Sequence, residues 1–383
     1  MKKRILLLSS ICIISFIGCK KYGSITSITC INDTNINEER YISSLFPNFE
    51  IVLLETIDES LIGQNINKIR KKDNKYFISY DKKAIVIFDH LGKFLSRIEK
   101  NGGGPSEYNN LRDFDVLPNG NIVILDVRKL LFYSFTGEFI KAIPLDITCY
   151  NLKVIDNDIF LICATAQDYI IYLVNGEGNI LSKQLERKNR HIMGKNPAFY
   201  ALGHDHIIYQ QYFSNDFLSF NTKTKEFINI NLLCNEDRIL DIEKENKYQK
   251  KFNNANYLEN NPGVRIINAI SSYNDCMFFV VGSQNSGFKG FLMNTTSNSI
   301  NCKLNEQTVD DICFTSHLSL LNTIEISDSE DCFITYLHPY QIIAGLDENR
   351  HLSEHPNYRR LQSLYKNIRN FEEENPVLIE LKR

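Results

Sequence analysis

An internal repeat relates two neighbouring stretches of this 383-residue chain without a gap. Residues 73–94 align with residues 118–139, and both copies read as a turn, two strands, a glycine turn and a third strand. Gly92 and Gly137 share one repeat position, where a tight hairpin turn requires a positive φ. Weaker copies follow, with turns at residues 175–178, 221–225 and 294–298, and a sixth unit begins near Phe314. Strands that recur in this way indicate repeated antiparallel units.

Six units of about 35–45 residues predict an all-β fold, a six-bladed β-propeller with four-stranded antiparallel blades. Residues 357–371 carry apolar side chains at helical spacing, so we expect a short C-terminal helix before a closing strand at residues 376–381. Residues 49–55 are the expected partner of that strand, since a propeller closes its ring with strands from both chain ends. Polar residues 235–261 are expected to be an insertion with some helix. Two β-sandwich domains are the alternative, which the ungapped repeat disfavours.

The N-terminus has the features of an export signal that ends in a lipoprotein cleavage box. Residues 2–4 are basic, residues 5–17 are mostly apolar, and Gly18 is the small residue before Cys19. The apolar run is too short for a stable membrane span. The box resembles that of bacterial lipoproteins, which implies a diacylglyceryl thioether on Cys19. We therefore expect a signal peptide over residues 1–18, a tether over 19–48 and the propeller over 49–383, with ordinary cleavage or an uncleaved anchor as the alternative.

Charge and hydropathy predict a water-exposed body attached to a membrane by lipid. Loss of residues 2–4 with the signal changes the formal net charge from −3 to −6, with both signs interspersed, which does not favour a nucleic-acid partner. No later segment approaches the roughly 18 apolar residues that a spanning helix needs. Lys20 and Lys21 follow the anchor in place of the Asp that retains some lipoproteins at the inner membrane. This favours the outer membrane, with the body on the periplasmic or the exterior side.

Four segments carry a family resemblance. They are residues 51–56, residues 88–95, residues 102–108 together with 114–116, and residues 375–379. On these residues the chain resembles the six-bladed β-propeller lipoproteins that are abundant in Bacteroides and its relatives, which are distantly similar to NHL-repeat propellers. The resemblance spans almost the whole mature chain. It implies the fold and an envelope location, and it implies little about activity.

The candidate ligand-binding residues lie in one loop and beside two strands. Gly102, Gly103 and Gly104 belong to a glycine-rich loop without the Gly-Lys-Ser/Thr of a P-loop. Such a loop is more often a connection between blades, but its backbone N–H groups could hold an anionic or hydroxylated ligand. The other candidates are polar residues expected near the mouth of the central channel, namely Arg112, Asp113 and Arg128.

Neither a metal site nor a catalytic site is predicted, although a divalent metal is not excluded. His204 and His206 would share one face of a strand, a spacing that suits zinc or copper, yet they align with a turn whose polar residues face solvent. Asp81 and Asp126 share one repeat position, which favours turn-stabilising carboxylates over metal ligands. The chain has no Gly-x-Ser-x-Gly nucleophile elbow.

The eight cysteines that follow Cys19 include no CxxC pair, and most lie in apolar, strand-like runs. Buried free thiols are therefore favoured over a disulfide framework. The sequence as a whole predicts a membrane-anchored envelope module that binds a ligand or a protein, with a glycan, a peptide or an envelope protein as candidate partners and no cofactor predicted. One alternative is a metal-dependent hydrolase or lyase at the channel mouth. The other is a structural component of an envelope complex, which would expose an apolar patch.

Overall fold

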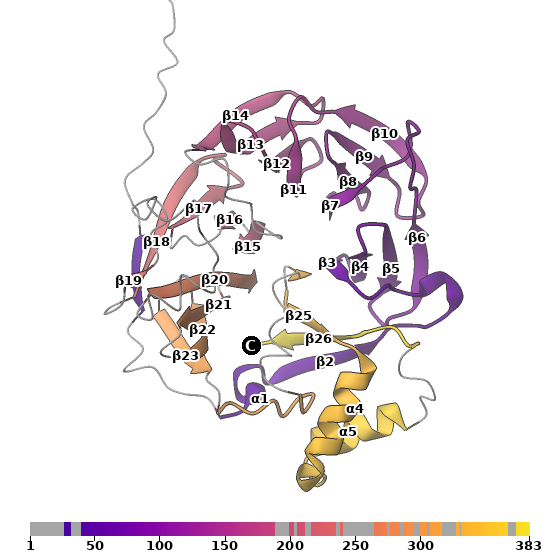
Figure 1. Ribbon diagram of the computed structural model, residues 1–383, viewed down its shortest axis with the longest axis vertical. Coiled ribbons are helices and arrows are strands. Elements are labelled where there is room, and N and C mark those ends of the chain that lie inside the picture. Colours follow the sequence, from indigo (N-terminus) through magenta and orange to yellow (C-terminus); the bar gives the residue numbers. More distant parts are fainter. Residues whose placement is uncertain are drawn as a thin grey trace, which may run out of the picture.

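The strands of the protein form six sheets arranged in a ring around a central axis, as Figure 1 shows. The structure is a computed structural model that describes residues 27–31, 40–187, 199–202, 205–210, 216–234, 238–239, 264–273, 276–283, 287–294, 299–304, 307–315, 327–329, 331–366 and 373–383. The ring confirms the predicted six-bladed β-propeller. The blades follow one another around the axis in chain order, so blade 4 lies opposite blade 1.

Blades 1 to 3 each contain a regular run of four antiparallel strands, with the first at the axis and the last at the rim (Figure 1). Blade 1 contains β3 (Ile66–Lys72), β4 (Lys75–Tyr80), β5 (Ala84–Asp89) and β6 (Phe94–Ile98). Blade 2 contains β7 (Leu111–Val116), β8 (Ile122–Asp126), β9 (Lys129–Tyr133) and β10 (Phe139–Pro144). Blade 3 contains β11 (Cys149–Asp156), β12 (Ile159–Ala164), β13 (Tyr169–Asn175) and β14 (Ile180–Glu186).

Blades 4 and 5 each gain a fifth, parallel strand. Blade 4 contains β15 (Phe199–Leu202), β16 (His206–Gln210), β17 (Asp216–Asn221) and β18 (Phe227–Cys234), and β1 (Ser27–Ile31) pairs with β18. Blade 5 contains β20 (Val264–Tyr273), β21 (Cys276–Ser283), β22 (Gly287–Asn294) and β23 (Ser299–Leu304), and β19 (Arg238–Ile239) pairs with β20. The sheet of blade 1 likewise gains a fifth, parallel strand, because the two-residue β24 (Ser327–Asp328) pairs with β3 at the axis. β1 falls within the stretch expected to be only a tether.

Blade 6 closes the ring with strands from both ends of the chain. Its described strands are β25 (Phe333–Leu337), β26 (Val377–Lys382) and β2 (Asn48–Leu53), and β26 pairs antiparallel with both of the others. The predicted pairing of residues 49–55 with the C-terminal strand is thereby confirmed. Part of the sixth unit expected from Phe314 onwards lies outside the described residues, as does most of the insertion expected at residues 235–261.

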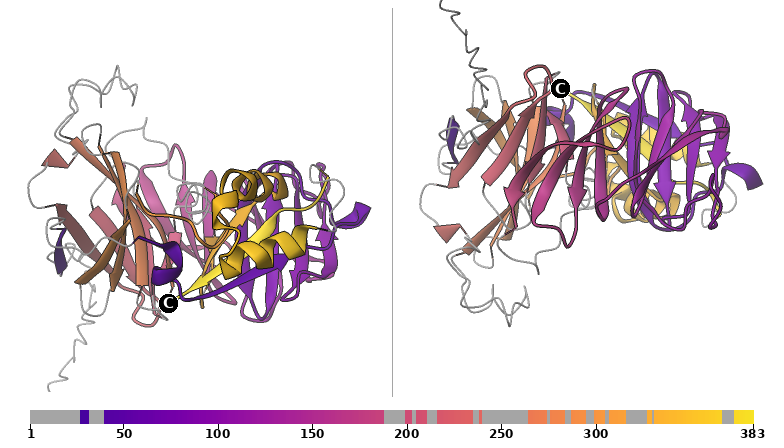
Figure 2. Two further views of the ribbon diagram at one scale, coloured as in Figure 1. Left: turned by 90° about the horizontal axis from the view of Figure 1, so that it is seen from below. Right: turned by 90° about the horizontal axis from the view of Figure 1, so that it is seen from above.

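Helices occur only around blade 6 in the described part of the chain. Between β25 and β26 the chain forms α4 (Pro339–Glu348), the 3₁₀ helix η5 (Arg350–Leu352) and α5 (Pro356–Tyr365), while α1 (Ile42–Leu45) precedes β2 and η2 (Asp58–Ser60) follows it. Both α4 and α5 start with proline, whose fixed φ suits the first helical position. Ile342 and Leu361 are buried against blade 6, so these helices pack beside it (Figures 1 and 2). The predicted helix corresponds to α5, and α4 was not predicted.

The repeated turn glycines join each blade to the one before it. Gly92, Gly137 and Gly178 have φ values of 82°, 85° and 88°. A Cβ atom on Gly92 would lie 2.1 Å from the carbonyl oxygen of Leu53 in blade 6, and one on Gly178 would lie 2.7 Å from that of Pro144 in blade 2. All three positions favour glycine for its conformation, and Gly92 and Gly178 require it also because the turn approaches the rim strand of the preceding blade so closely.

Apolar side chains fill the spaces between adjacent blades. Phe77 and Ile87 of blade 1 belong to the same buried cluster as Phe114 and Ile124 of blade 2, for example. Five cysteines in the described part of the chain are buried and free, namely Cys149, Cys163, Cys276, Cys313 and Cys332, which confirms the expectation of free thiols for these five. Within the described ranges, no helix is both long and apolar enough to cross a membrane.

Candidate functional site

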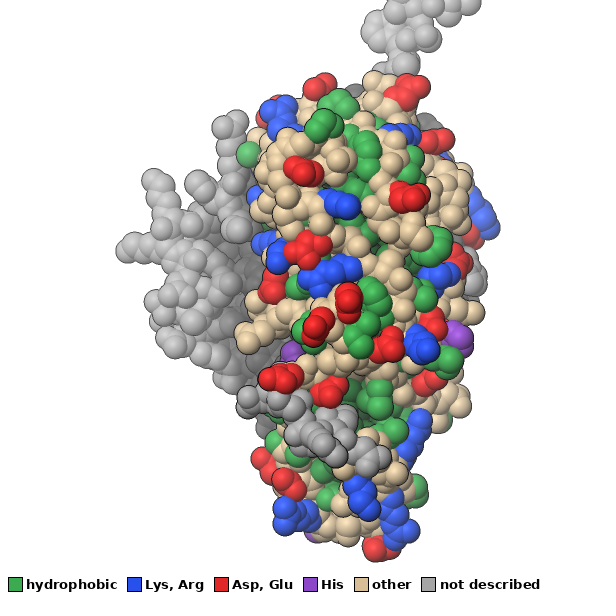
Figure 3. Space-filling model, turned by 90° about the vertical axis from the view of Figure 1, so that its right-hand side faces the viewer, with side chains coloured by type: hydrophobic (Ala, Val, Ile, Leu, Met, Phe, Trp, Pro, Cys, Tyr) green, Lys and Arg blue, Asp and Glu red, His purple; other side chains and the backbone are tan. Residues whose placement is uncertain are grey.

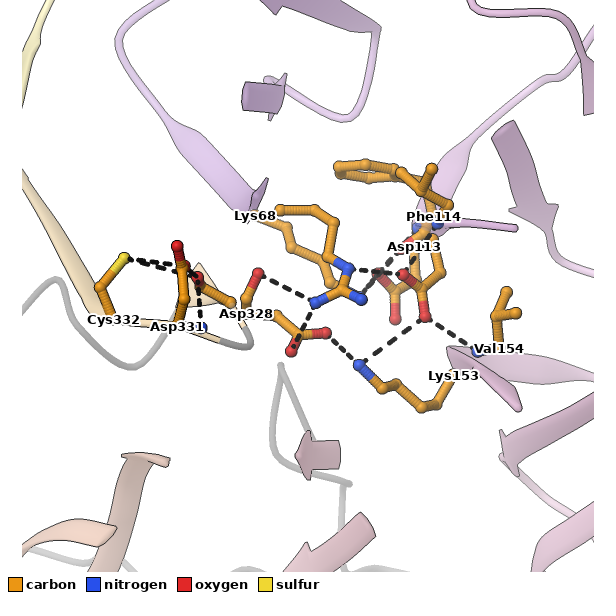
Figure 4. Close-up of polar contacts among 12 residues, drawn as sticks. Lys68, Asp113, Phe114, Lys153, Val154, Asp328, Asp331 and Cys332 are labelled. Atoms are coloured by element: carbon orange, nitrogen blue, oxygen red, sulfur yellow. Dashed lines mark hydrogen bonds and ion pairs between the residues drawn. The ribbon is translucent and has the colours of Figure 1, made fainter. Parts of the chain in front are cut away.

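Charged side chains from four strands meet at the propeller axis, where Figure 4 shows their contacts. They come from β3 and β7 of blades 1 and 2, from β11 of blade 3 and from β24, which approaches from the side of blade 6. All are almost fully buried. This axial network consists of three cations and three carboxylates, namely Lys68, Arg70, Lys153, Asp113, Asp115 and Asp328.

Each cation of the axial network contacts at least one carboxylate from another strand. Lys68 Nζ lies 3.0 Å from Asp113 Oδ1. Arg70 Nε lies 3.2 Å from Asp115 Oδ1, and its guanidinium also lies 3.1 Å from Asp328 Oδ1. The Lys153 ammonium pairs with Asp328 and lies 3.9 Å from Asp115 Oδ2. The network therefore connects blades 1, 2 and 3 to β24.

The two carboxylates on β7 also bind the backbone of the next blade. Asp113 Oδ2 accepts a hydrogen bond of 2.8 Å from the N–H of Leu152, and Asp115 Oδ2 accepts one of 2.8 Å from the N–H of Val154. β7 and β11 belong to different sheets, and no ladder of backbone hydrogen bonds joins them. In this propeller, side-chain carboxylates join β7 to β11 instead.

The electrostatic balance favours the charged forms of Lys68, Asp115 and Asp328, whereas burial raises the pKa of Asp113 despite the nearby Lys68 ammonium. Burial lowers the pKa of Lys68, but the three nearby carboxylates outweigh this effect and raise the pKa overall. Burial raises the pKa of Asp115 and of Asp328, but the surrounding cations outweigh it and hold both values below the ordinary range. Three positive and three negative charges compensate one another, which is the condition for burying charge without a large penalty.

A second polar cluster lies where blade 6 meets blade 1. Glu380 on β26 lies 2.6 Å from Lys71 Nζ, and it accepts a hydrogen bond of 2.6 Å from the Tyr76 hydroxyl. Lys71 Nζ also lies 3.1 Å from Asp331 Oδ2 and 3.9 Å from Cys332 Sγ. Burial raises the pKa of the Cys332 thiol, so this sulfur is protonated at neutral pH. Because its donors and acceptors pair with one another, this cluster stabilises the contact between blade 6 and blade 1, where the ring closes.

The glycine-rich loop connects the rim strand of blade 1 to the inner strand of blade 2. The N–H of Gly102 donates to the carbonyl of Tyr108 at 3.0 Å, and the N–H of Gly104 donates to the Glu107 carboxylate at 2.8 Å. Gly103 is exposed. Two of the three backbone donors considered for a ligand are thus engaged within the loop, as a connection between blades would require.

The other candidates do not gather into one site. Asp113 belongs to the axial network, whereas Arg112 is half-buried, and Arg128 is exposed and donates to the carbonyl of Asp146 at 3.3 Å. Cys19 lies outside the described residues. Sequence reasoning missed the partners of Asp113, although Lys68 and Arg70 stand 45 residues before Asp113 and Asp115. Opposite charges at equivalent repeat positions were the available signal.

The described residues contain no group of three or more His, Cys, Asp or Glu side chains that could hold a metal ion. His204 lies outside them. Both ring nitrogens of His206 are engaged, at 3.0 Å from Ser219 Oγ and 3.3 Å from Asn221 Nδ2. Asp126 accepts a hydrogen bond of 3.1 Å from the N–H of Asn109, and Asp81 accepts one of 2.9 Å from Asn65 Nδ2. The contacts of Asp126 and Asp81 hold loop residues in place, whereas those of His206 join β16 to β17.

Exposed apolar side chains lie on the rim of blades 1 and 2, interspersed with charged ones, on the side of the molecule that faces the viewer in Figure 3. Arg97 on β6 donates to the carbonyl of Leu61 at 3.1 Å, and the Ser96 hydroxyl donates to the carbonyl of Phe135. These contacts place the β2–β3 connection and the β9–β10 turn directly beside β6. We call the six exposed side chains of this region the rim patch: Ile57, Leu61, Leu95, Phe135, Phe139 and Ile140.

Comparisons with known proteins bear on the family and the fold. A family model described as "Domain of unknown function (DUF4934)" matches residues 25–382. No curated protein matches the chain significantly. Among solved structures, a Bacteroides fragilis protein inferred to be exported is 17% identical over 93% of this chain and 100% of its own, with a TM-score of 0.70. At this identity the likeness concerns the fold.

Two further solved structures align over smaller parts. BamB from Moraxella catarrhalis is 11% identical over 66% of this chain and 63% of its own, with a TM-score of 0.37. A protein of unknown function from Bacteroides caccae is 10% identical over 62% of this chain and 85% of its own, with a TM-score of 0.37.

Proposed function

The chain belongs to the DUF4934 family, and we propose that it is an exported lipoprotein of the cell envelope whose propeller is an interaction module for another protein. The observation that carries this proposal is the rim patch. Six large apolar side chains are exposed on the rim of two adjacent blades, on a body that buries most such residues between its blades. Exposed apolar clusters with a polar surround are typical of interaction surfaces.

The properties of the axial network favour binding at the rim rather than at the axis. Its charged groups are buried and compensate one another, and its carboxylates hold neighbouring blades together. A ligand that claimed these groups would have to break contacts on which the ring depends. The catalytic alternative has no comparable support, since the described residues supply no cluster of metal ligands.

The N-terminal sequence supports the anchor. Basic residues, an apolar run and Gly18-Cys19 fit export followed by lipidation of Cys19, and Lys20 and Lys21 favour the outer membrane. Two or more acyl chains hold a protein stably at a bilayer, so the propeller would work at the membrane surface.

Metabolic labelling tests the anchor. Cells that express the chain are fed an alkyne fatty acid, and the purified protein is assayed for the label. We expect label in the wild-type chain and none in Cys19→Ser, which should also leave the membrane fraction. An unlabelled wild-type chain would refute the anchor.

Native electrophoresis of detergent-solubilised membranes tests the interaction. The labelled chain should migrate within an assembly larger than its monomer. Migration as a monomer, together with a rise in melting temperature on adding a glycan or a peptide, would favour a small-ligand role instead.

A further inference from the structure

The rim strands of the first four blades differ in one structural respect. In blades 1, 2 and 3 the pairing of the rim strand skips one residue, which makes a β-bulge, and the skipped residues are Leu95, Ile140 and Leu181. All three are exposed aliphatic side chains at the third position after the turn glycine. In blade 4 the pairing of β17 with β18 has no skip, and there β18 accepts β1 as a further strand.

This difference indicates how each rim can bind. A bulge at a sheet edge interrupts the row of backbone groups that an added strand would need, and proteins use bulges to prevent edge pairing. The unbulged edge of blade 4 is already occupied by the chain's own β1. The bulged edges of blades 1 and 2 instead present aliphatic side chains. A partner of the rim patch therefore makes side-chain contacts rather than extending the sheet.

The position of β1 limits what the rim patch can face. Eight residue steps separate Cys19 from Ser27, the first residue of β1, and at about 3.5 Å per step they reach at most about 28 Å. A body of about 340 residues has a radius of gyration of about 20 Å and hence a width of about 50 Å. β1 lies on the rim of blade 4, opposite blade 1. The tether is thus shorter than the molecule is wide.

Two orientations at the membrane remain. If the ring stands on its edge, blade 4 is nearest the bilayer and the rim patch points away from it. If the ring lies flat, the rim patch points sideways, parallel to the bilayer. The third orientation, with the rim patch against lipid, would raise Ser27 further from the bilayer than the tether reaches.

We propose that the rim patch is the docking surface for a second, different protein of the envelope, which meets it with an apolar face in the aqueous compartment and not through the bilayer. This inference rests on the proposed lipid anchor at Cys19. Arg97, Glu99, Lys93 and Glu138 flank the patch with both signs of charge. The partner is accordingly an apolar surface with a mixed polar rim rather than a strongly charged one.

Photo-crosslinking in the native host tests this surface. A photoreactive phenylalanine analogue replaces Leu95 in the full-length lipoprotein, and the adducts are identified by mass spectrometry. The same experiment is run with Ile140→Glu as a second substitution and, as the matched control, with Leu181→Glu. These two residues occupy the same bulge position, but only Ile140 belongs to the rim patch. We expect one protein adduct that falls at least about tenfold with Ile140→Glu, as burial of an unpaired carboxylate predicts, and persists with Leu181→Glu.

Every other outcome overturns the inference. An adduct with lipid would mean that the patch faces the bilayer, and an adduct of two copies of this chain would mean self-association. No adduct, or a protein adduct that Ile140→Glu leaves unchanged, would mean that the patch is not the docking surface. Label at Cys19 in the same cells separates the two proposals: a labelled chain without the expected adduct refutes only this inference. An unlabelled chain refutes the anchor and, with it, the orientation argument.

Discussion

Replacement of Gly92 by alanine should weaken the contact between blade 1 and the closing blade. Alanine at a φ of 82° costs about 1–2 kcal/mol, of which about 0.4–1 kcal/mol is recovered because alanine restricts the unfolded chain. The new Cβ would lie 2.1 Å from the Leu53 carbonyl oxygen, so β2 or the turn has to move, at a further cost of about 1–3 kcal/mol. We expect a total loss of about 2–4 kcal/mol in the free energy of unfolding.

Two other turn glycines serve as controls for Gly92. Gly120 has a φ of 84° and nothing within 4 Å of its added Cβ, so Gly120→Ala measures the conformational cost alone, about 1 kcal/mol. Gly137 has a φ of 85°, and its Cβ would lie 3.4 Å from the Arg97 carbonyl oxygen, an ordinary contact. Gly137→Ala should therefore resemble Gly120→Ala and not Gly92→Ala.

Differential scanning calorimetry of the three variants measures the difference. An unfolding entropy of about 2.1 cal/mol/K per residue over about 340 residues converts 1 kcal/mol into about 1.4 °C. Gly92→Ala should lower the melting temperature by about 3–6 °C, and the two controls by about 1–2 °C each. Equal shifts for Gly92→Ala and Gly120→Ala would show that the approach of the turn to β2 has no energetic consequence, and would refute the reasoning.

Three further predictions concern buried groups. Asp328→Asn leaves buried cations uncompensated and should lower the free energy of unfolding, measured with denaturant, by about 3–5 kcal/mol. Glu99→Gln, which removes a part-exposed ion pair at the rim, should lower it by about 1 kcal/mol or less. Equal losses would contradict the structural role of the axial network. The pKa values of Asp115 and Asp328 are lowered on folding, so their stabilisation is complete above the unfolded value of about 3.9 and is lost as pH falls below it. The melting temperature should drop below about pH 4, less so in Asp328→Asn, and a flat profile would exclude this linkage. Burial raises the pKa of Cys149 and of Cys163 to about 12, so both thiols should resist iodoacetamide at pH 8 until the protein is denatured. Peptide mass spectrometry measures the alkylation, and modification of either thiol in the folded protein would contradict this prediction.

The fold could be predicted from the sequence because repeat position determines spatial position in a ring of blades. The Gly92 and Gly137 turns, the two closing strands and α5 all follow from the periodicity of the chain. Helix α4 does not, since Gly345 interrupts its pattern and reads as a break. The structure explains that glycine: a Cβ on Gly345 would lie 2.4 Å from the Phe314 carbonyl oxygen, so tertiary packing overrides helix propensity there.

The axial network was predictable only in part. Lys68 and Arg70 precede Asp113 and Asp115 by the repeat length, so their contacts could have been inferred from opposite charges at equivalent positions of adjacent inner strands. The contacts of Asp328 could not have been inferred, because the repeat has degraded in the last blade. The position of Asp328 relative to β3 follows only from the closed ring. The rim patch needed the structure as well, since exposure of Leu95 or Ile140 depends on a bulge that alternation does not reveal.

Closure of blade 6 has a consequence for how the protein folds. Residues 48–53 pair with residues 377–382, so the last contact of the ring joins segments separated by almost the whole chain. Such a non-local contact makes folding slow, because the loop-closure entropy is lost before the contact forms. In an exported chain β2 crosses the membrane early and β26 last, so the ring stays open until translocation ends. Until then the unpaired edge of β2 is exposed, and a chaperone on the far side of the membrane would be most useful at that stage.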